Sequence, residues 1–195
     1  MKKSLVWVPL TTFLLATMAF SNSDHHKSKY MGQENRKIKS LSPDDIKELK
    51  KGGGWGLAKA AELNGYPGPS HILQMANKID LQEKQKVQIQ KLFDQMKVKS
   101  ISLGNKLISL EKKLNNEFQN KTINQTKLDT YINDITDVRA QLRLTHLSTH
   151  LQTPKILTPQ QVLLYNNLRG YSKDPCQNIP KNHDIAMWKK HNGCK

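Results

Sequence analysis

The sequence predicts an all-α protein built on a long antiparallel helical hairpin with short flanking helices and a disulfide-closed C-terminal tail. Two long stretches without proline carry apolar residues at heptad spacing, and a polar segment rich in turn formers separates them. Runs with the alternation of a β-strand are nearly absent. The two helical stretches should therefore fold back on each other and bury their apolar rows.

Residues 1–21 are typical of a secretory signal peptide. The segment MKKSLVWVPLTTFLLATMAFS has two lysines, an uncharged apolar stretch and a small-x-small pattern at its end. The apolar stretch of about sixteen residues is shorter than the roughly 20 that a bilayer-spanning helix needs. We expect export to the periplasm with cleavage near Ser21.

The exported chain is strongly basic. Subtracting Lys2 and Lys3 from the formal charge of +15 leaves about +13, because the removed segment has no acidic residue. Such a charge favours acidic partners, anionic surfaces or negatively charged unfolded chains. We expect no nucleic-acid binding, since the protein is exported and no basic motif interleaved with aromatic side chains appears.

A basic linker and a short helix precede the hairpin. Residues 22–40 have almost no apolar periodicity, which predicts disorder, and a helical domain should span residues 41–171. Ser42 is a suitable cap for a helix that stops at the glycines of GGGWG. That run lacks the lysine and hydroxyl residue of a phosphate-binding loop, so we interpret it as a flexible joint. After a break at residues 66–70, the apolar pattern predicts a short amphipathic helix over residues 71–79.

The hairpin itself should begin near Gln82. One helix continues to about Phe118, the chain reverses at residues 120–124, and Pro154 ends the second arm. Thr158 caps a last helix that runs to Gly170. The heptad rows predicted to meet in the seam are mostly apolar. They are Met96, Leu103 and Leu110 with Ser100, Leu107 and Leu114 on the first arm, and Leu128, Ile135, Leu142 and Thr149 with Tyr131, Val138 and Thr145 on the second.

His146 and His150 lie one helical turn apart and could bind one metal ion, zinc or copper. Zinc proteases also use this separation, but Leu147 stands where they carry a glutamate, so metal-dependent hydrolysis is not expected. Two interpretations stay open. The histidines are partly exposed polar residues beside the helical contact, or they have a metal-binding or pH-sensing role.

The Cys-containing tail spans residues 172–195. An oxidising compartment favours a disulfide between Cys176 and Cys194. By closing a loop it would lower the entropy of the unfolded chain and so stabilise the folded state by about 3 kcal/mol. The alternative is a zinc site with His183 and His191, although these spacings match no common short zinc motif. Neither cysteine has the neighbourhood of a nucleophile, and no nucleotide or hydrolase motif appears, so we do not expect an enzyme.

Two short segments resemble a known motif. Leu157-Thr158-Pro159-Gln160-Gln161 matches the pattern LTxxQ, and Leu81-Gln82-Glu83-Lys84-Gln85 is a partial earlier copy with Gln82 in place of threonine. Each copy stands at a predicted helix start, where leucine anchors the chain in the core, threonine caps the first turn and glutamine can bond backbone. An all-helical exported protein with Leu81, Gln85, Leu157, Thr158 and Gln161 so placed resembles the Spy/CpxP family of periplasmic chaperones and stress or metal-resistance proteins.

The resemblance spans roughly residues 66–171. It implies a curved four-helix cradle that pairs with a second copy and holds partly unfolded envelope proteins without ATP on a basic concave face. Some members instead bind zinc or other heavy metals, which makes metal sensing or resistance the alternative function, and docking on the periplasmic domain of a sensor protein is a third. The residues we expect to contact clients are Lys84, Lys91, Met96, Lys99, Lys106 and Lys113.

Overall fold

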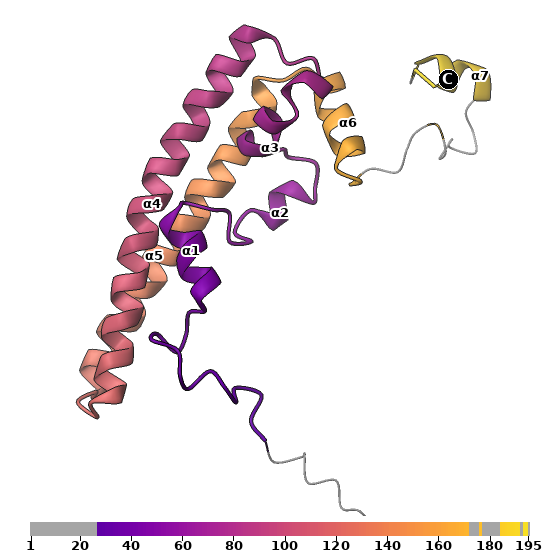
Figure 1. The fold of residues 1–195 in the computed structure, drawn as a ribbon. Helices are drawn as coiled ribbons and strands as arrows, with labels where there is room; N and C mark the ends of the chain where they lie inside the picture. Colours follow the sequence, from indigo (N-terminus) through magenta and orange to yellow (C-terminus); the bar gives the residue numbers. More distant parts are fainter. Residues whose placement is uncertain (1–26, 172–175, 177–183, 192, 195) are drawn as a thin grey trace, which may run out of the picture. The chain divides into compact units, whose positions relative to one another are not determined.

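The computed structural model describes residues 27–171, 176, 184–191 and 193–194 (Figure 1). The chain divides into two units, Met1–Glu34 and Asn35–Lys195. In the first, the described residues 27–34 form turns, one of them closed by the Met31 amide, which donates to the Ser28 carbonyl at 3.0 Å. The predicted signal peptide of residues 1–21 lies outside the described residues.

Every regular element in these described ranges is a helix, so the all-α prediction is confirmed. None of those helices is both long enough and apolar enough to span a membrane. The helices, in chain order, are α1 (Pro43–Lys50), α2 (Lys59–Glu62), α3 (Pro69–Gln74), η2 (Ala76–Lys78), α4 (Glu83–Gln119), α5 (Gln125–Gln152), η3 (Thr153–Lys155), α6 (Pro159–Leu168) and α7 (Ile185–His191).

The hairpin of α4 and α5 is the largest element of the second unit. The two helices have 37 and 28 residues and pack side by side (Figure 1). Their seam is the one that heptad spacing predicts, because Leu107 and Val138 are fully buried and Leu142 nearly so. Asn124 caps α5 after the reversal by accepting a hydrogen bond from the Lys127 amide.

Helix α1 crosses α4 at a glycine. Ser42 and Asp45 form the reciprocal capping box that starts α1, and Leu49 near its end is buried in the core of the hairpin. A side chain at Gly104 of α4 would collide with the backbone of Leu49, so only glycine permits this close crossing.

The GGGWG segment is packed against its neighbours, which differs from the free joint that its composition suggests. Gly52 has φ +67 and is buried against Lys97 and Ile101 of α4. The Trp55 indole donates to Asp45 Oδ1 at 2.8 Å, and the Arg139 guanidinium lies 5.0 Å from its ring centroid. These contacts attach the segment to α1 and α5.

The predicted boundary of the disordered linker at residue 40 is wrong at its C-terminal end. Ile38 is only 3% exposed and belongs to the same core as Leu103 and Leu142. Ser40 donates to Glu111 of α4 at 2.7 Å, and the Lys39 amide donates to Asn115. A single apolar residue in a basic run gives no periodic signal, so the sequence does not indicate that Ile38 is buried. Its burial comes from its place in the core with residues of α4 and α5.

A second core closes the end of the hairpin where α4 begins. Ile72 from α3, Ile89 from α4 and Tyr165 from α6 are all 0% exposed there. The short helices before and after the hairpin therefore meet at one end of it, and this is where both copies of the predicted motif lie.

Candidate functional site

The two motif glutamines join the start of α4 to the start of α6. Gln85 Nε2 donates to Gln161 Oε1, and Gln161 Nε2 donates to Gln85 Oε1, each over 2.9 Å. Gln85 Nε2 also donates to the Ile156 carbonyl at 2.8 Å, while its Oε1 accepts from the Gln82 amide at 3.1 Å. One side chain thus caps its own helix and binds the other loop.

Gln161 repeats this pattern in the opposite direction. Its Oε1 accepts from the Thr158 amide at 2.9 Å, its Nε2 donates to the Asp80 carbonyl at 3.0 Å, and Thr158 Oγ1 accepts from the Gln161 amide. The two accepting carbonyls occupy equivalent positions, since Asp80 is five residues before Gln85 and Ile156 is five residues before Gln161. Each glutamine therefore bonds the loop that precedes the helix of the other glutamine. Leu157 is 9% exposed and Leu81 is half-buried, which anchors both helix starts. We assign these motif residues a structural role.

The five predicted client-binding lysines form one exposed row along α4. Lys84, Lys91, Lys99, Lys106 and Lys113 are spaced seven or eight residues apart and are all exposed. At 100° per residue they fall within an arc of roughly 80°, and at 1.5 Å per residue they span about 44 Å. No hydrogen bond or ion pair within the described residues holds any of them. We call this set the lysine row.

The lysine row lies on the side of α4 opposite to α1. Gly104, which contacts α1, is displaced from the row by roughly 140–220° around the helix axis. Lys86 and Lys97 share the side of Gly104 and so lie off the row. Met96 is the exception among the predicted client contacts, because it is only 8% exposed. Its heptad position directs the side chain inward, so Met96 is a core residue and not part of the exposed surface.

His146 and His150 are buried, which corrects the expectation that they are partly exposed. They are 3% and 6% exposed, respectively. His146 Nε2 lies 3.2 Å from the Ser100 hydroxyl, and His150 Nδ1 lies 2.7 Å from the Tyr66 carbonyl. Burial, followed by the proximity of His150, holds the pKa of His146 below its ordinary value of 6.5. His146 is therefore neutral at neutral pH.

A third histidine lies near this pair and belongs to a polar network around Glu62. Glu62 Oε1 accepts from Arg169 and Tyr171, both at 2.8 Å, and from Tyr165 at 3.3 Å, and His71 Nδ1 is 3.2 Å away. Burial by itself raises the pKa of Glu62. The hydrogen bonds that it accepts and the neighbouring cations lower the pKa more, so it lies below the ordinary value of 4.5. Burial is also the largest influence on His71 and lowers its pKa.

Sequence reasoning missed this network. Glu62 is a single acid in a short helix, and Arg169 lies more than 100 residues later, so no spacing links them. The sequence pattern predicts Tyr165 only as an apolar residue of the last helix. The network joins α2, α3 and α6, and it lies beside the histidines of α5.

The histidines line one cleft of about 480 Å³ between the GGGWG segment, α2, α3, α4 and α5. His71, His146 and His150 all contribute to its wall, together with Met96 and Phe93. Within the described residues, however, no group of three or more His, Cys, Asp or Glu side chains is placed to hold a metal ion. The geometry therefore gives the predicted zinc or copper site at His146 and His150 no third ligand of these types.

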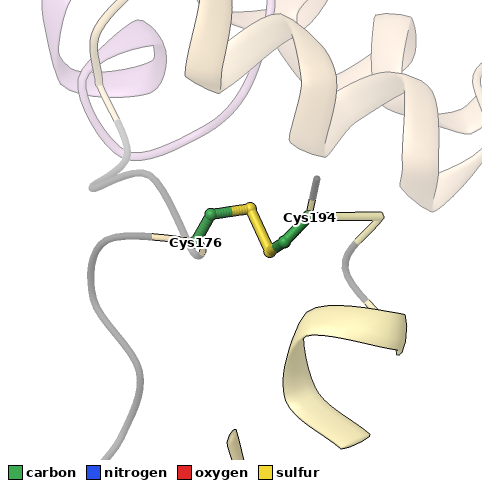
Figure 2. The surroundings of a disulfide bond; sticks show 2 residues. All are labelled: Cys176 and Cys194. Atoms are coloured by element: carbon green, nitrogen blue, oxygen red, sulfur yellow. A yellow bond between two sulfur atoms is a disulfide. The ribbon is translucent and has the colours of Figure 1, made fainter. Parts of the chain in front are cut away.

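The predicted disulfide is present in the tail (Figure 2). Cys176 and Cys194 are bonded over a sequence separation of 18, with Cα atoms 5.5 Å apart. The pairing excludes both thiols as ligands of the alternative zinc site. His183 lies outside the described residues, and only the backbone of His191 is described.

No family model, curated protein or solved structure matches the chain.

Proposed function

We propose that the protein is an ATP-independent periplasmic chaperone that binds partly unfolded envelope proteins along the lysine row. The observation that carries this proposal is the row itself: five exposed lysines, free of ion pairs within the described residues, over about 44 Å of one helix. A protein would not need this arrangement for its own stability, because unpaired surface lysines contribute little to folding.

Apolar side chains flank the lysine row. Val87 and Val98 of α4 are 66% and 71% exposed and lie within about one helix quadrant of Lys91. Lysines can attract a negatively charged unfolded chain over a distance, and neighbouring apolar surface can then hold it weakly. Weak, shallow contact suits a chaperone that releases its clients without ATP.

The predicted export and the basic charge of the chain agree with this function. An excess of about 13 positive charges favours capture of acidic clients. The disulfide is compatible with the oxidising periplasm.

Pairing with a second copy is part of the proposal. Light scattering of the purified mature protein will measure the mass of the particle in solution and so test this pairing. Docking on a sensor domain would use the same basic surface.

The test is suppression of client aggregation by the mature protein at low salt without nucleotide. The triple variant Lys91→Glu, Lys99→Glu, Lys106→Glu should lose most of the suppression, because it reverses the centre of the row. The matched control Lys47→Glu, Lys50→Glu, Lys86→Glu makes the same charge change at positions off the row and should retain most of it. Failure of the wild type, or equal loss in both variants, would refute the proposal.

A further inference from the structure

The cleft beside the histidines is a second surface, independent of the lysine row. Its volume of about 480 Å³ falls within the range of small-ligand sites. It opens on the side of α4 that carries Lys97 and faces α1, whereas the row lies on the opposite side. The chemistry of its lining indicates what it can bind.

One wall of the cleft is apolar and fixed in place. Trp55, Phe93 and Met96 line it. Trp55 is held by its hydrogen bond to Asp45 and by the Arg139 guanidinium over its ring, so this wall is formed before any ligand arrives. An apolar side chain of a ligand would contact this surface.

A hydrogen-bond acceptor lies in the cleft wall next to this apolar surface. The Tyr66 carbonyl can only accept, so the His150 Nδ1 at 2.7 Å is the donor, and in the neutral imidazole the acceptor is then Nε2. No hydrogen bond within the described part of the chain engages that Nε2, although His150 is only 6% exposed. A Cβ on Gly68 would lie 2.6 Å from Nε2 and 2.7 Å from Cε1, so only glycine permits the chain to pack this closely against the His150 ring.

The rim of the cleft carries positive charge. Lys59 and Lys97 are exposed and have no ion pair within the described residues. The two carboxylates in the lining are already engaged, since Glu48 pairs with Lys51 and Glu62 accepts from Arg169 and its neighbouring hydroxyls. A ligand with a carboxylate would be attracted to these two lysines, although the Lys97 ammonium also lies 5.5 Å from the Phe93 ring centroid.

We propose that this cleft binds the C-terminal residue of a polypeptide. Such a residue combines the three groups that the cleft complements: a terminal carboxylate for Lys59 and Lys97, an amide N–H that donates to His150 Nε2, and a side chain for the apolar wall. An apolar, preferably aromatic, last residue fits the wall best. A free N-acyl amino acid shares this chemistry, and the test separates the two sources.

Fluorescence anisotropy of a fluorescein-labelled peptide Gly-Ser-Leu-Phe, titrated with the mature protein, provides the test. The peptide with a free carboxylate should bind at least ten times more tightly than the same peptide with a C-terminal amide. Lys59→Gln, Lys97→Gln should weaken binding about tenfold, and Lys84→Gln, Lys99→Gln on the lysine row should leave it unchanged. Gly68→Ala, checked for native helix content, should also weaken binding because its methyl group would collide with the His150 ring and displace it.

Several outcomes would overturn this proposal. They are equal affinity for the acid and the amide, unchanged binding by the Lys59 and Lys97 variant, or tighter binding of unlabelled N-acetylphenylalanine than of unlabelled Gly-Ser-Leu-Phe in competition. The last result would assign the cleft to a free N-acyl amino acid. Aggregation suppression should survive in Lys59→Gln, Lys97→Gln, so failure here and failure of the chaperone proposal are separate results.

Discussion

Gln85 and Gln161 form a closed amide pair, in which each side chain donates to and accepts from the other over 2.9 Å. The pair bridges two helix starts that are 76 residues apart in the sequence. Each glutamine also bonds the backbone of the opposite loop, at Ile156 or Asp80. The junction therefore sets the position of α6 relative to α4.

Replacing either glutamine should weaken this junction. Gln85→Ala or Gln161→Ala leaves partly buried backbone groups without their partner, which should cost about 1–3 kcal/mol of unfolding free energy in urea titrations. Gln160→Ala, one position away and exposed, is the matched control and should change stability by less than about 0.5 kcal/mol.

The two glutamine substitutions should also be coupled. In a double-mutant cycle, the combined variant should lose less stability than the sum of the single variants, by roughly 0.5–3 kcal/mol. The reason is that the first substitution already breaks both amide–amide bonds. Strict additivity would show that the pair does not act as one unit.

Gly104→Ala should destabilise the crossing of α1 over α4. The added methyl group collides with the Leu49 backbone, and backbone cannot move aside as a side chain can, so a loss of about 1–3 kcal/mol is expected. Circular dichroism during thermal unfolding will measure it, with Asn105→Ala at the neighbouring exposed position as the control. Since alanine favours helices more than glycine does, a stabilised Gly104→Ala variant would contradict the close crossing.

Acidification should destabilise the protein through His146. Its folded pKa is lowered by burial, so the unfolded chain takes up a proton first as the pH falls below about 6.5. Stability is therefore complete above that pH and declines as the pH falls toward the folded pKa, with a slope of at most about 1.4 kcal/mol per pH unit for one proton.

The variant His146→Gln should flatten this dependence, measured as urea midpoints at pH 7.5 and 5.5. The comparison is His71→Gln, whose side chain is 33% exposed and whose pKa shifts in the same direction. It should flatten the dependence less, because water screens a more exposed group. Parallel pH curves for His146→Gln and wild type would rule out His146 as the source.

Reduction of the disulfide should affect only the tail. Cys176 and Cys194 both lie after α6, so the bond closes a loop that contains α7 and does not cross-link the hairpin. Hydrogen exchange with and without reductant should show faster exchange in residues 176–194 and unchanged protection in α4 and α5. Loss of hairpin protection on reduction would contradict this expectation.

The hairpin could be predicted because its signal is periodic and local. Heptad rows such as Leu103, Leu107 and Leu110 need a partner with the same spacing, and the chain supplies one after a short turn. The lysine row follows equally from spacing, since five lysines seven or eight residues apart share one side of any α-helix. Pairing of the cysteines could be predicted from the expected export and from the absence of other cysteines in the sequence.

The cleft could not be predicted, because its residues come from the glycine-rich segment and from five helices, α1 to α5, without a common period. The burial of His146 and His150 depends on the glycine-rich segment and α3, which cover that part of α5. Met96 was predicted both as a seam residue and as a client contact, and its burial supports only the first of these roles. By itself the sequence determined which helices form and which faces are apolar, since those depend on neighbours within a few turns. Only the tertiary structure decided which polar side chains are buried together, because that depends on how segments distant in the chain exclude water from one another.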